Sequence, residues 1–329
     1  MRRRAALALA LGLAVALAAG TGWLACALRD RPDLAPFAAD RLPAAPAAGG
    51  LRVTFLGVAT LLVSDGETAI LTDGFFTRPP LWRTVAWRVA PDPGAIEAGL
   101  ARAGIDRLAA VVVVHSHYDH AMDAPLVAER TGALLVGSES TAQIARGLGF
   151  DEARIRVPAP GESFPFGRFR VSLIPSRHFP HGMAMGTIDA PLVPPARATD
   201  YKEGGSFSVL IEHERGRLLV QGSAGFVPGA LRDVRADVVA LGIGGLGTRD
   251  DAYRDDYWRE TVEAVGARRV IPIHYDDFTV PLEEPPVPAP NLLDDVAGSL
   301  RFLRERAGAG RDVRLAPAWQ AVDPLADLP

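Results

Sequence analysis

Short apolar runs and amphipathic stretches alternate along most of this chain. The most apolar run is Val111-Val-Val-Val114, and four consecutive β-branched residues are typical of a strand buried on both faces. By similar reasoning we expect strands over residues 51–56, 60–64, 68–72, 133–136, 169–174, 206–212, 217–221, 237–241 and 269–273. Helices are expected over residues 93–103, 121–130, 138–146, 253–265 and 291–306. This alternation predicts an α/β layered fold.

Residues with capping preferences mark several of the expected helix ends. Asp92 is placed to cap the helix that begins at Pro93, and Gly104 is placed to end it. Ser138 is placed to cap a second helix, and Asn291 a third. These residues therefore predict helix boundaries as well as helices.

The N-terminal 28 residues differ from the rest of the chain. Three arginines follow Met1, and the stretch from Ala5 to Leu28 carries no charge. This pattern predicts either a cleaved signal peptide or an uncleaved N-terminal membrane anchor, since about 20 apolar residues span a bilayer. Both alternatives place the protein outside the cytoplasm, in the periplasm or held at the inner membrane. A Pro-, Ala- and Gly-rich linker is expected over residues 29–50, followed by one domain over residues 51–329.

Composition narrows the class of protein. Hydrophobic residues make up 48% and charged residues 22% of the 329 positions, which is a globular composition. The formal net charge of −4 offers no basis for binding nucleic acid. The single cysteine, Cys26, excludes an intrachain disulfide framework and a cysteine-rich zinc module.

Four candidate metal ligands directly follow the valine run. His115, His117, Asp119 and His120 lie within six residues. In extended chain His115 and His117 point the same way, and a turn before the next helix brings the other two back toward them. Neutral imidazoles and a carboxylate suit zinc, with other first-row metals possible. Ordinary polar residues at a strand end are the alternative, and this spacing argues against it.

The motif His115-x-His117-x-Asp119-His120 resembles the H-x-H-x-D-H signature of the metallo-β-lactamase superfamily of metal-dependent hydrolases. The resemblance extends from about residue 51 to residue 284. Gly57-Val-Ala-Thr60, Ile70-Leu-Thr-Asp73 and Ile271-Pro-Ile-His274-Tyr resemble the branch that contains ascorbate-lactonase-like and N-acyl-phosphatidylethanolamine phospholipase D-like proteins. Because the superfamily supports many reactions on one scaffold, the resemblance indicates fold and metal more strongly than substrate.

The resemblance implies a four-layer αββα sandwich, in which two mixed sheets pack face to face with helices outside. It also implies that residues 51–329 form a catalytic domain with two zinc ions at one edge of the sheets. The implied ligands are His115, His117 and His178 for the first ion, and Asp119, His120 and His274 for the second. Asp73 is expected to hydrogen-bond a ligand, or else to be a plain turn residue. His181 is expected to contact substrate or donate a proton, or else to face solvent from a loop.

The glycine turn over residues 222–225 departs from the family pattern. Most members carry an aspartate there that bridges the two metals, whereas this chain has Ser223. A neutral hydroxyl cannot replace the shared negative charge, so the second metal is expected to bind more weakly. A serine that merely fills the turn is the alternative.

Three irregular stretches are expected near the site. Residues 179–205 follow a candidate ligand and are either a lid or a surface insertion. The glycine-rich residues 242–247 are expected to let the backbone pass close to the site. Residues 75–89, with Trp82 and Trp87, are either a substrate-facing rim or a loop pinned by aromatic rings.

Taken with the resemblance, these features predict a zinc-dependent hydrolase. A metal-bound hydroxide is expected to attack an ester, lactone, amide or phosphodiester bond of a small-molecule or lipid-like substrate. Asp119 is expected to orient the hydroxide and relay a proton. The alternatives are an oxygenase with one iron and a non-catalytic metal-binding protein. Membrane association is expected through the N-terminus.

Overall fold

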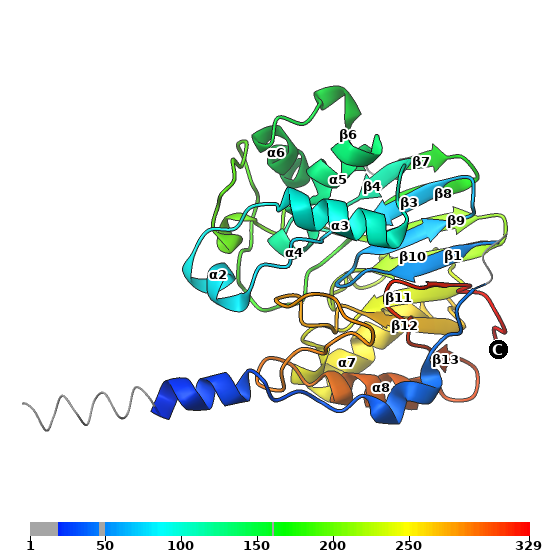
Figure 1. Cartoon of the computed structure of the whole chain (residues 1–329). Helices are drawn as coiled ribbons and strands as arrows, with labels where there is room; N and C mark the ends of the chain where they lie inside the picture. The colour runs from blue at the N-terminus through cyan, green and yellow to red at the C-terminus, as the bar shows by residue number, and fades with distance from the viewer. Residues whose placement is uncertain (1–18, 46–49, 160) are drawn as a thin grey trace, which may run out of the picture.

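Two seven-stranded sheets pack face to face in the computed structural model, which describes residues 19–45, 50–159 and 161–329 (Figure 1). The order of the first sheet is β14-β1-β2-β3-β4-β5-β6, and that of the second is β13-β12-β11-β10-β9-β8-β7. In each sheet the pairings change from antiparallel to parallel at the fourth strand, β3 in the first and β10 in the second. Both sheets are therefore mixed, as expected.

The strands are short in the first sheet and longer in the second. The first sheet contains β1 (Arg52–Phe55), β2 (Leu61–Ser64), β3 (Ala69–Thr72), β4 (Ala110–Val112), β5 (Leu134–Val136), β6 (Ile155–Arg156) and β14 (Ala321–Val322). The second contains β7 (Ser163–Phe166), β8 (Phe169–Ser176), β9 (Ser206–His213), β10 (Gly216–Gln221), β11 (Val238–Gly242), β12 (Arg269–Ile273) and β13 (Asp312–Val313).

Helices cover the outer faces of both sheets, which completes four layers (Figure 1). The first sheet is covered by α3 (Pro93–Ala103), α4 (Tyr118–Ala121), α5 (Ala124–Thr131) and α6 (Glu139–Gly147). The second is covered by α7 (Asp251–Trp258), a π-helical turn (Arg259–Glu263) and α8 (Val296–Ala307). The predicted four-layer sandwich is confirmed.

The valine run is buried on both faces, as predicted. Val111 and Val113 pack into the core between the first sheet and its helices. Val112 and Val114 belong to the core between the two sheets. This division follows from the alternation of side chains along extended chain, and it holds the residues that follow the run firmly in place.

Most of the expected helix ends are confirmed. The Asp92 side chain accepts hydrogen bonds from the backbone at the start of α3, Gly104 ends that helix in the left-handed region, and Ser138 caps α6. The prediction for Asn291 was wrong, because α8 begins at Val296 and Asp295 caps it. The Asn291 side chain instead donates to Asp30.

Two further helical stretches differ from expectation. The helix expected over residues 253–265 begins earlier, at Asp251, and changes to a π-helical turn at Arg259. Within residues 75–89, which showed no clear period, Leu81–Ala86 forms the short helix α2. None of the side chains of α2 is buried, so its sequence has no apolar face that repeats with the helical period.

The N-terminal segment is described from residue 19, and residues 19–27 are helical. None of the helices in the described part of the chain is long and apolar enough to cross a membrane. Residues 1–18 of the expected signal peptide or anchor lie outside the described residues, so those alternatives stay predictions. The expected linker packs on the domain, because Ala35–Asp40 forms a 3₁₀ turn and both Phe37 and Leu42 are buried.

We expect Arg269→Met to lower the free energy of unfolding by about 3–5 kcal/mol, because it leaves buried acceptors without their donor. Arg269 is fully buried at the start of β12, donates two hydrogen bonds to Asp312, and also donates to the carbonyls of Pro324 and Ala326. Urea denaturation of the variant measures the change. The neighbouring Arg268, which is half-exposed and pairs with Asp237, is the matched control. Arg268→Met should lower the free energy of unfolding by at most about 1 kcal/mol. Equal losses of stability in the two variants would show that the hydrogen bonds of Arg269 do not stabilise the fold as proposed.

Candidate metal centre and its pocket

The candidate ligands follow the carboxyl ends of strands from both sheets. β4 leads into His115, β8 leads into His178, and β12 ends one residue before His274. Asp73 follows β3 in the same way, and β3 runs parallel to β4. Because the carboxyl ends of parallel strands meet at one edge of a sheet, residues far apart in the sequence gather at one place.

The first group contains His115, His117 and His178, whose ring centroids lie 4.5–4.8 Å apart. Both ring nitrogens of His115 are buried and lack a hydrogen-bond partner. The Nδ1 of His178 lies 2.8 Å from the Phe179 carbonyl, and the Nε2 of His117 lies 3.2 Å from the Ala184 carbonyl. Each carbonyl accepts a hydrogen bond from the N–H of its imidazole, which leaves the other ring nitrogen with a free lone pair.

The second group contains Asp119, His120 and His274, whose ligand atoms also converge. The Nε2 atoms of His120 and His274 lie 3.3 Å apart. The Oδ2 of Asp119 lies 3.5 Å from the first of these atoms and 3.4 Å from the second. Atoms that bind one tetrahedral zinc at about 2.0–2.2 Å stand about 3.3–3.6 Å from each other, so this group has the spacing of a metal site.

The surroundings of His115, His178 and Asp119 favour the protonation states that metal binding requires. Burial and the nearby histidines hold the pKa of His115 well below its ordinary value, and burial together with His117 lowers the pKa of His178 to about 3. Burial would raise the pKa of Asp119, but the attraction of His120 and His274 outweighs it and lowers that pKa below its usual range. At neutral pH His115 and His178 are therefore neutral and Asp119 is ionised. Burial would lower the pKa of His120, but the attraction of Asp119 and Asp73 outweighs it and raises that pKa.

Asp73 is positioned as expected, beside a candidate ligand. It accepts a hydrogen bond from His120 Nδ1 at 2.7 Å and a second from the backbone of Val114 at 2.9 Å. The contact fixes the proton on Nδ1, so Nε2 of His120 points its lone pair at His274 and Asp119. The expected alternative, a plain turn aspartate, does not describe this buried and doubly bonded carboxylate.

His181 and Ser223 lie at the edge of the site. The ring of His181 is 4.6 Å from that of His178 and lines the same pocket. The Ser223 hydroxyl accepts a hydrogen bond from the backbone of Phe179 at 2.9 Å. Ser223 thus steadies the residue next to His178 and belongs to neither group of converging ligand atoms.

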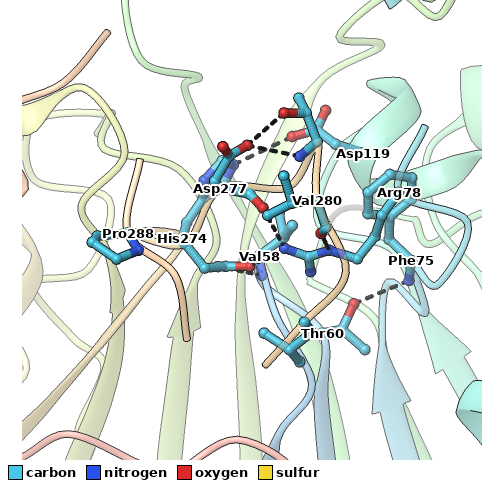
Figure 2. Close-up of polar contacts among 12 residues, drawn as sticks. Val58, Thr60, Phe75, Arg78, Asp119, His274, Asp277, Val280 and Pro288 are labelled. Carbon is cyan, nitrogen blue, oxygen red and sulfur yellow. Dashed lines mark hydrogen bonds and ion pairs between the residues drawn. The ribbon is translucent and has the colours of Figure 1, made fainter. Parts of the chain in front are cut away.

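A network that the sequence analysis missed holds His274 in place (Figure 2). The backbone of His274 donates to the Val58 carbonyl at 2.8 Å, and the backbone of Val58 donates to Asp276 at 2.9 Å. Arg78 pairs with Asp276 and also donates to the carbonyls of Val280 and Asp277. In the sequence, the position of Asp276 two residues after His274 is the feature that could have indicated its role in supporting that histidine.

Backbone strain is concentrated in the same network. Val58, Asp73, Arg78 and His274 all have positive φ values, between 42° and 57°, although none of them is glycine. Such conformations cost of order 1–3 kcal/mol each and persist where surrounding contacts hold them. Val58 is the most unfavourable case, since a β-branched side chain rarely adopts this region. The hydrogen bonds to Asp276 and His274 are the contacts that hold it.

The glycine-rich residues 242–247 pass close to the site, as expected. A Cβ on Gly244 would stand 2.9 Å from Nδ1 of His274, and one on Gly245 would stand 2.7 Å from the ring of Phe179. Any side chain here would displace the ligand or its neighbour. The glycines are therefore required by the close approach of backbone to the metal centre.

Both groups open into a cavity of about 440 Å³. His117, Asp119, His178 and His274 lie in its wall, and about half of the other lining residues are apolar: Leu81, Phe179, Met183, Ala184, Ala198, Phe278, Ala289, Pro290 and Leu293. The stretch 179–205 contributes Met183 and Ala184, and the carbonyl of Glu203 near its end accepts from the backbone of Ser116. This stretch therefore forms part of the wall of the cavity.

We expect Asp276→Ala to weaken the second metal site by about 10–100-fold while leaving the first unchanged, because it removes the support of Val58 and His274. Asp276→Asn, whose amide oxygen can still accept from Val58, should retain more of the affinity. Wild type and both variants are titrated with a chelator, and the metal released is recorded to measure the affinity of each site.

Removing Asp276 alone also leaves Arg78 as a buried, unpaired charge, which destabilises the protein. The double variant Arg78→Met/Asp276→Ala removes that charge and serves as the control. If the double variant regains both stability and full affinity for the second metal, Asp276 does not position His274.

Comparison with known proteins agrees with the fold and the site. Residues 68–275 match the β-lactamase superfamily domain. A UPF0173 metal-dependent hydrolase of Heliobacterium modesticaldum is 27% identical over 241 residues, which cover 70% of this chain and 84% of the relative.

Two solved structures share the fold at low sequence identity. An isothiocyanate hydrolase from Delia radicum gut bacteria has a TM-score of 0.51 and 17% identity, covering 82% of this chain and 98% of its own. CmlA, a diiron β-hydroxylase from Streptomyces venezuelae, has a TM-score of 0.50 and 15% identity, covering 82% of this chain and 53% of its own. At these identities the two structures speak for the fold alone. With the domain match and the related hydrolases, this chain belongs to the β-lactamase superfamily and is a metal-dependent hydrolase with the metallo-β-lactamase fold.

Proposed function

We propose that this protein is a zinc hydrolase with two metal sites in the wall of a largely apolar cavity. The first ion would be held by His115, His117 and His178, and the second by Asp119, His120 and His274. The observation that carries the proposal is the convergence of these buried ligand atoms, which have few partners of their own. Zinc bound here would supply a Lewis acid and, by lowering the pKa of a bound water toward 7, a nucleophile at neutral pH.

The residues around the ligands have separate tasks in this proposal. Asp119 stays ionised at neutral pH, faces the cavity, and would orient the attacking water and accept its proton. Asp73 keeps the proton of His120 on Nδ1, and Asp276 holds the backbone that carries His274. His181, which lines the cavity, is placed to contact a substrate or to donate a proton to a leaving group.

The lining of the cavity supports an amphipathic substrate. A volume of about 440 Å³ lies within the usual range for a drug-sized ligand, and the walls away from the metal site are mainly apolar. We propose an ester, lactone, amide or phosphodiester that carries an apolar group. The resemblance of the motifs to the branch with phospholipase D-like members also supports a lipid-like substrate.

An iron oxygenase is the second candidate, and one observation favours it. Asp119, His120 and His274 form a set of two histidines and one carboxylate, which is also the set that holds a single iron in non-haem oxygenases. The three histidines of the first group, however, suit zinc and would have no task in a protein with one iron. Metal analysis of the purified protein separates two zinc ions from one iron.

We also propose that the N-terminal segment takes the protein out of the cytoplasm. The support is the arginine triplet followed by 24 uncharged residues, Ala5 to Leu28. Small-molecule or lipid-like substrates would then be met in the periplasm or at the inner membrane.

We expect His117→Ala to abolish hydrolysis and to reduce bound zinc, because it removes one of three ligands of the first ion. The purified variant is tested against lactones, phosphodiesters and β-lactams, with zinc content and circular dichroism measured on the same sample. His213, the one histidine outside the site, is the control, because it is buried beside Asp65 at the other end of the sheet. His213→Ala should keep its zinc and its activity. If His117→Ala also keeps full zinc and full activity, the assignment of the site is wrong.

We expect Ser223→Asp to tighten the second metal more than the first. A carboxylate can still accept the hydrogen bond from Phe179 and adds a negative charge that both cations share. Zinc release under increasing chelator is compared for wild type, Ser223→Asp and Ser223→Ala. Simultaneous release of both ions at one chelator concentration in all three proteins would show that position 223 does not control the second site.

A further inference from the structure

Exposed apolar side chains stand on three segments of the chain that also contribute residues to the wall of the cavity. Trp82, Val85 and Trp87 stand on and after α2, whose first residue, Leu81, lines the cavity. Met183 and Met185 come from the stretch 179–205, and Leu292 and Leu293 follow the wall residue Pro290. We call these seven residues the rim. The exposed fractions are large, 65% for Trp82, 79% for Val85 and 67% for Trp87, so the rim meets solvent with its apolar atoms.

The composition of the α2 part of the rim is that of a segment at a lipid headgroup boundary. Residues 81–88 contain two tryptophans and two exposed arginines, Arg83 and Arg88, and no acidic residue. Tryptophan is enriched where one side of the ring meets acyl chains and the other meets water. Arginine beside it is attracted to anionic lipid headgroups. An apolar face that only closed over the cavity would have no need of the two charges.

The N-terminal segment leaves the domain at the wall of the same cavity. Arg31 donates to the Pro288 carbonyl at 2.5 Å and to Asp277 at 2.7 Å. Asn291 donates to Asp30 through both its backbone and its side chain, at 2.9 and 3.0 Å. Asp277 itself lines the cavity, and Asn291 lies between the wall residues Pro290 and Leu293.

These bonds place the end of the uncharged stretch beside the rim. The helix over residues 19–27 extends from the body on the side of the molecule where α2 also protrudes (Figure 1). Only two residues separate Leu28 from Arg31, which is bonded to the wall. A membrane that holds the N-terminal segment therefore lies close to the mouth of the cavity.

We propose that the rim docks on an anionic bilayer surface, so that the cavity opens toward the membrane that holds the N-terminal segment. The proposal rests on the membrane-anchor alternative for the N-terminal segment and on the active site proposed above, and it adds the orientation: substrate enters from the lipid phase. Trp82 and Trp87 sit at the level of the headgroups, and Arg83 and Arg88 contact lipid phosphates. Asp30 and Arg31 hold the anchor against the wall of the cavity.

The test uses the full chain reconstituted into vesicles of phosphatidylglycerol and phosphatidylcholine whose acyl chains carry bromine, a contact quencher of tryptophan. We expect the bromine atoms to quench the tryptophan emission of the wild type. Trp23 should be quenched in every variant. The further quenching, which we assign to Trp82 and Trp87, should be mostly lost in Trp82→Phe/Trp87→Phe. Trp258→Phe is the matched control, because Trp258 is buried in the core and its removal should leave the quenched component intact. Arg83→Gln/Arg88→Gln should reduce the quenching in phosphatidylglycerol and leave it unchanged in pure phosphatidylcholine.

An equal quenched component in wild type and Trp82→Phe/Trp87→Phe would overturn the proposal, since the anchor would then hold the domain away from the bilayer. The proposal would also be overturned if the protein isolated from cells lacked residues 1–28 and did not bind to the vesicles. Neither readout depends on turnover. A failed hydrolase assay with intact quenching would therefore count against the proposed reaction and not against the docking surface.

Discussion

The structure depends on one constraint: the lone pairs of the candidate metal ligands converge where water has little access. Both ring nitrogens of His115 are buried without a partner, and the Nε2 atoms of His120 and His274 face each other at 3.3 Å. A buried acceptor without a partner costs about 1–3 kcal/mol, and several facing one another cost more. A shared cation removes that cost, so the metal contributes to folding as well as to chemistry.

The architecture meets this constraint by supporting each ligand from behind. Valines buried on both faces of β4 fix the start of the histidine motif, and Asp73 orients His120 from the neighbouring strand. His274, which follows β12 of the second sheet, is supported by hydrogen bonds: its backbone bonds to Val58, and Val58 bonds to Asp276, although Val58 and His274 both lie in the left-handed region.

The same edge joins the metal centre to the N-terminal segment. Asp277, three residues after His274, lines the cavity and binds Arg31, the third residue after the uncharged stretch. The pair therefore ties the N-terminal segment to the wall of the cavity. This connection gives the exposed tryptophans and the acidic residues after His274 a common explanation.

The sequence by itself determined the local features that short-range physics controls. The valine run, the spacing of His115 to His120, and the caps at Asp92 and Ser138 depend on neighbours within a few residues, and the structure has them where they were expected. Only the tertiary structure decided what depends on distant partners. Asn291 is bound to Asp30 and does not cap a helix, α2 forms without a buried face, and Arg78 reaches Asp276 across the cavity wall. No periodicity records such contacts, because each joins residues that are neighbours only after both sheets have packed.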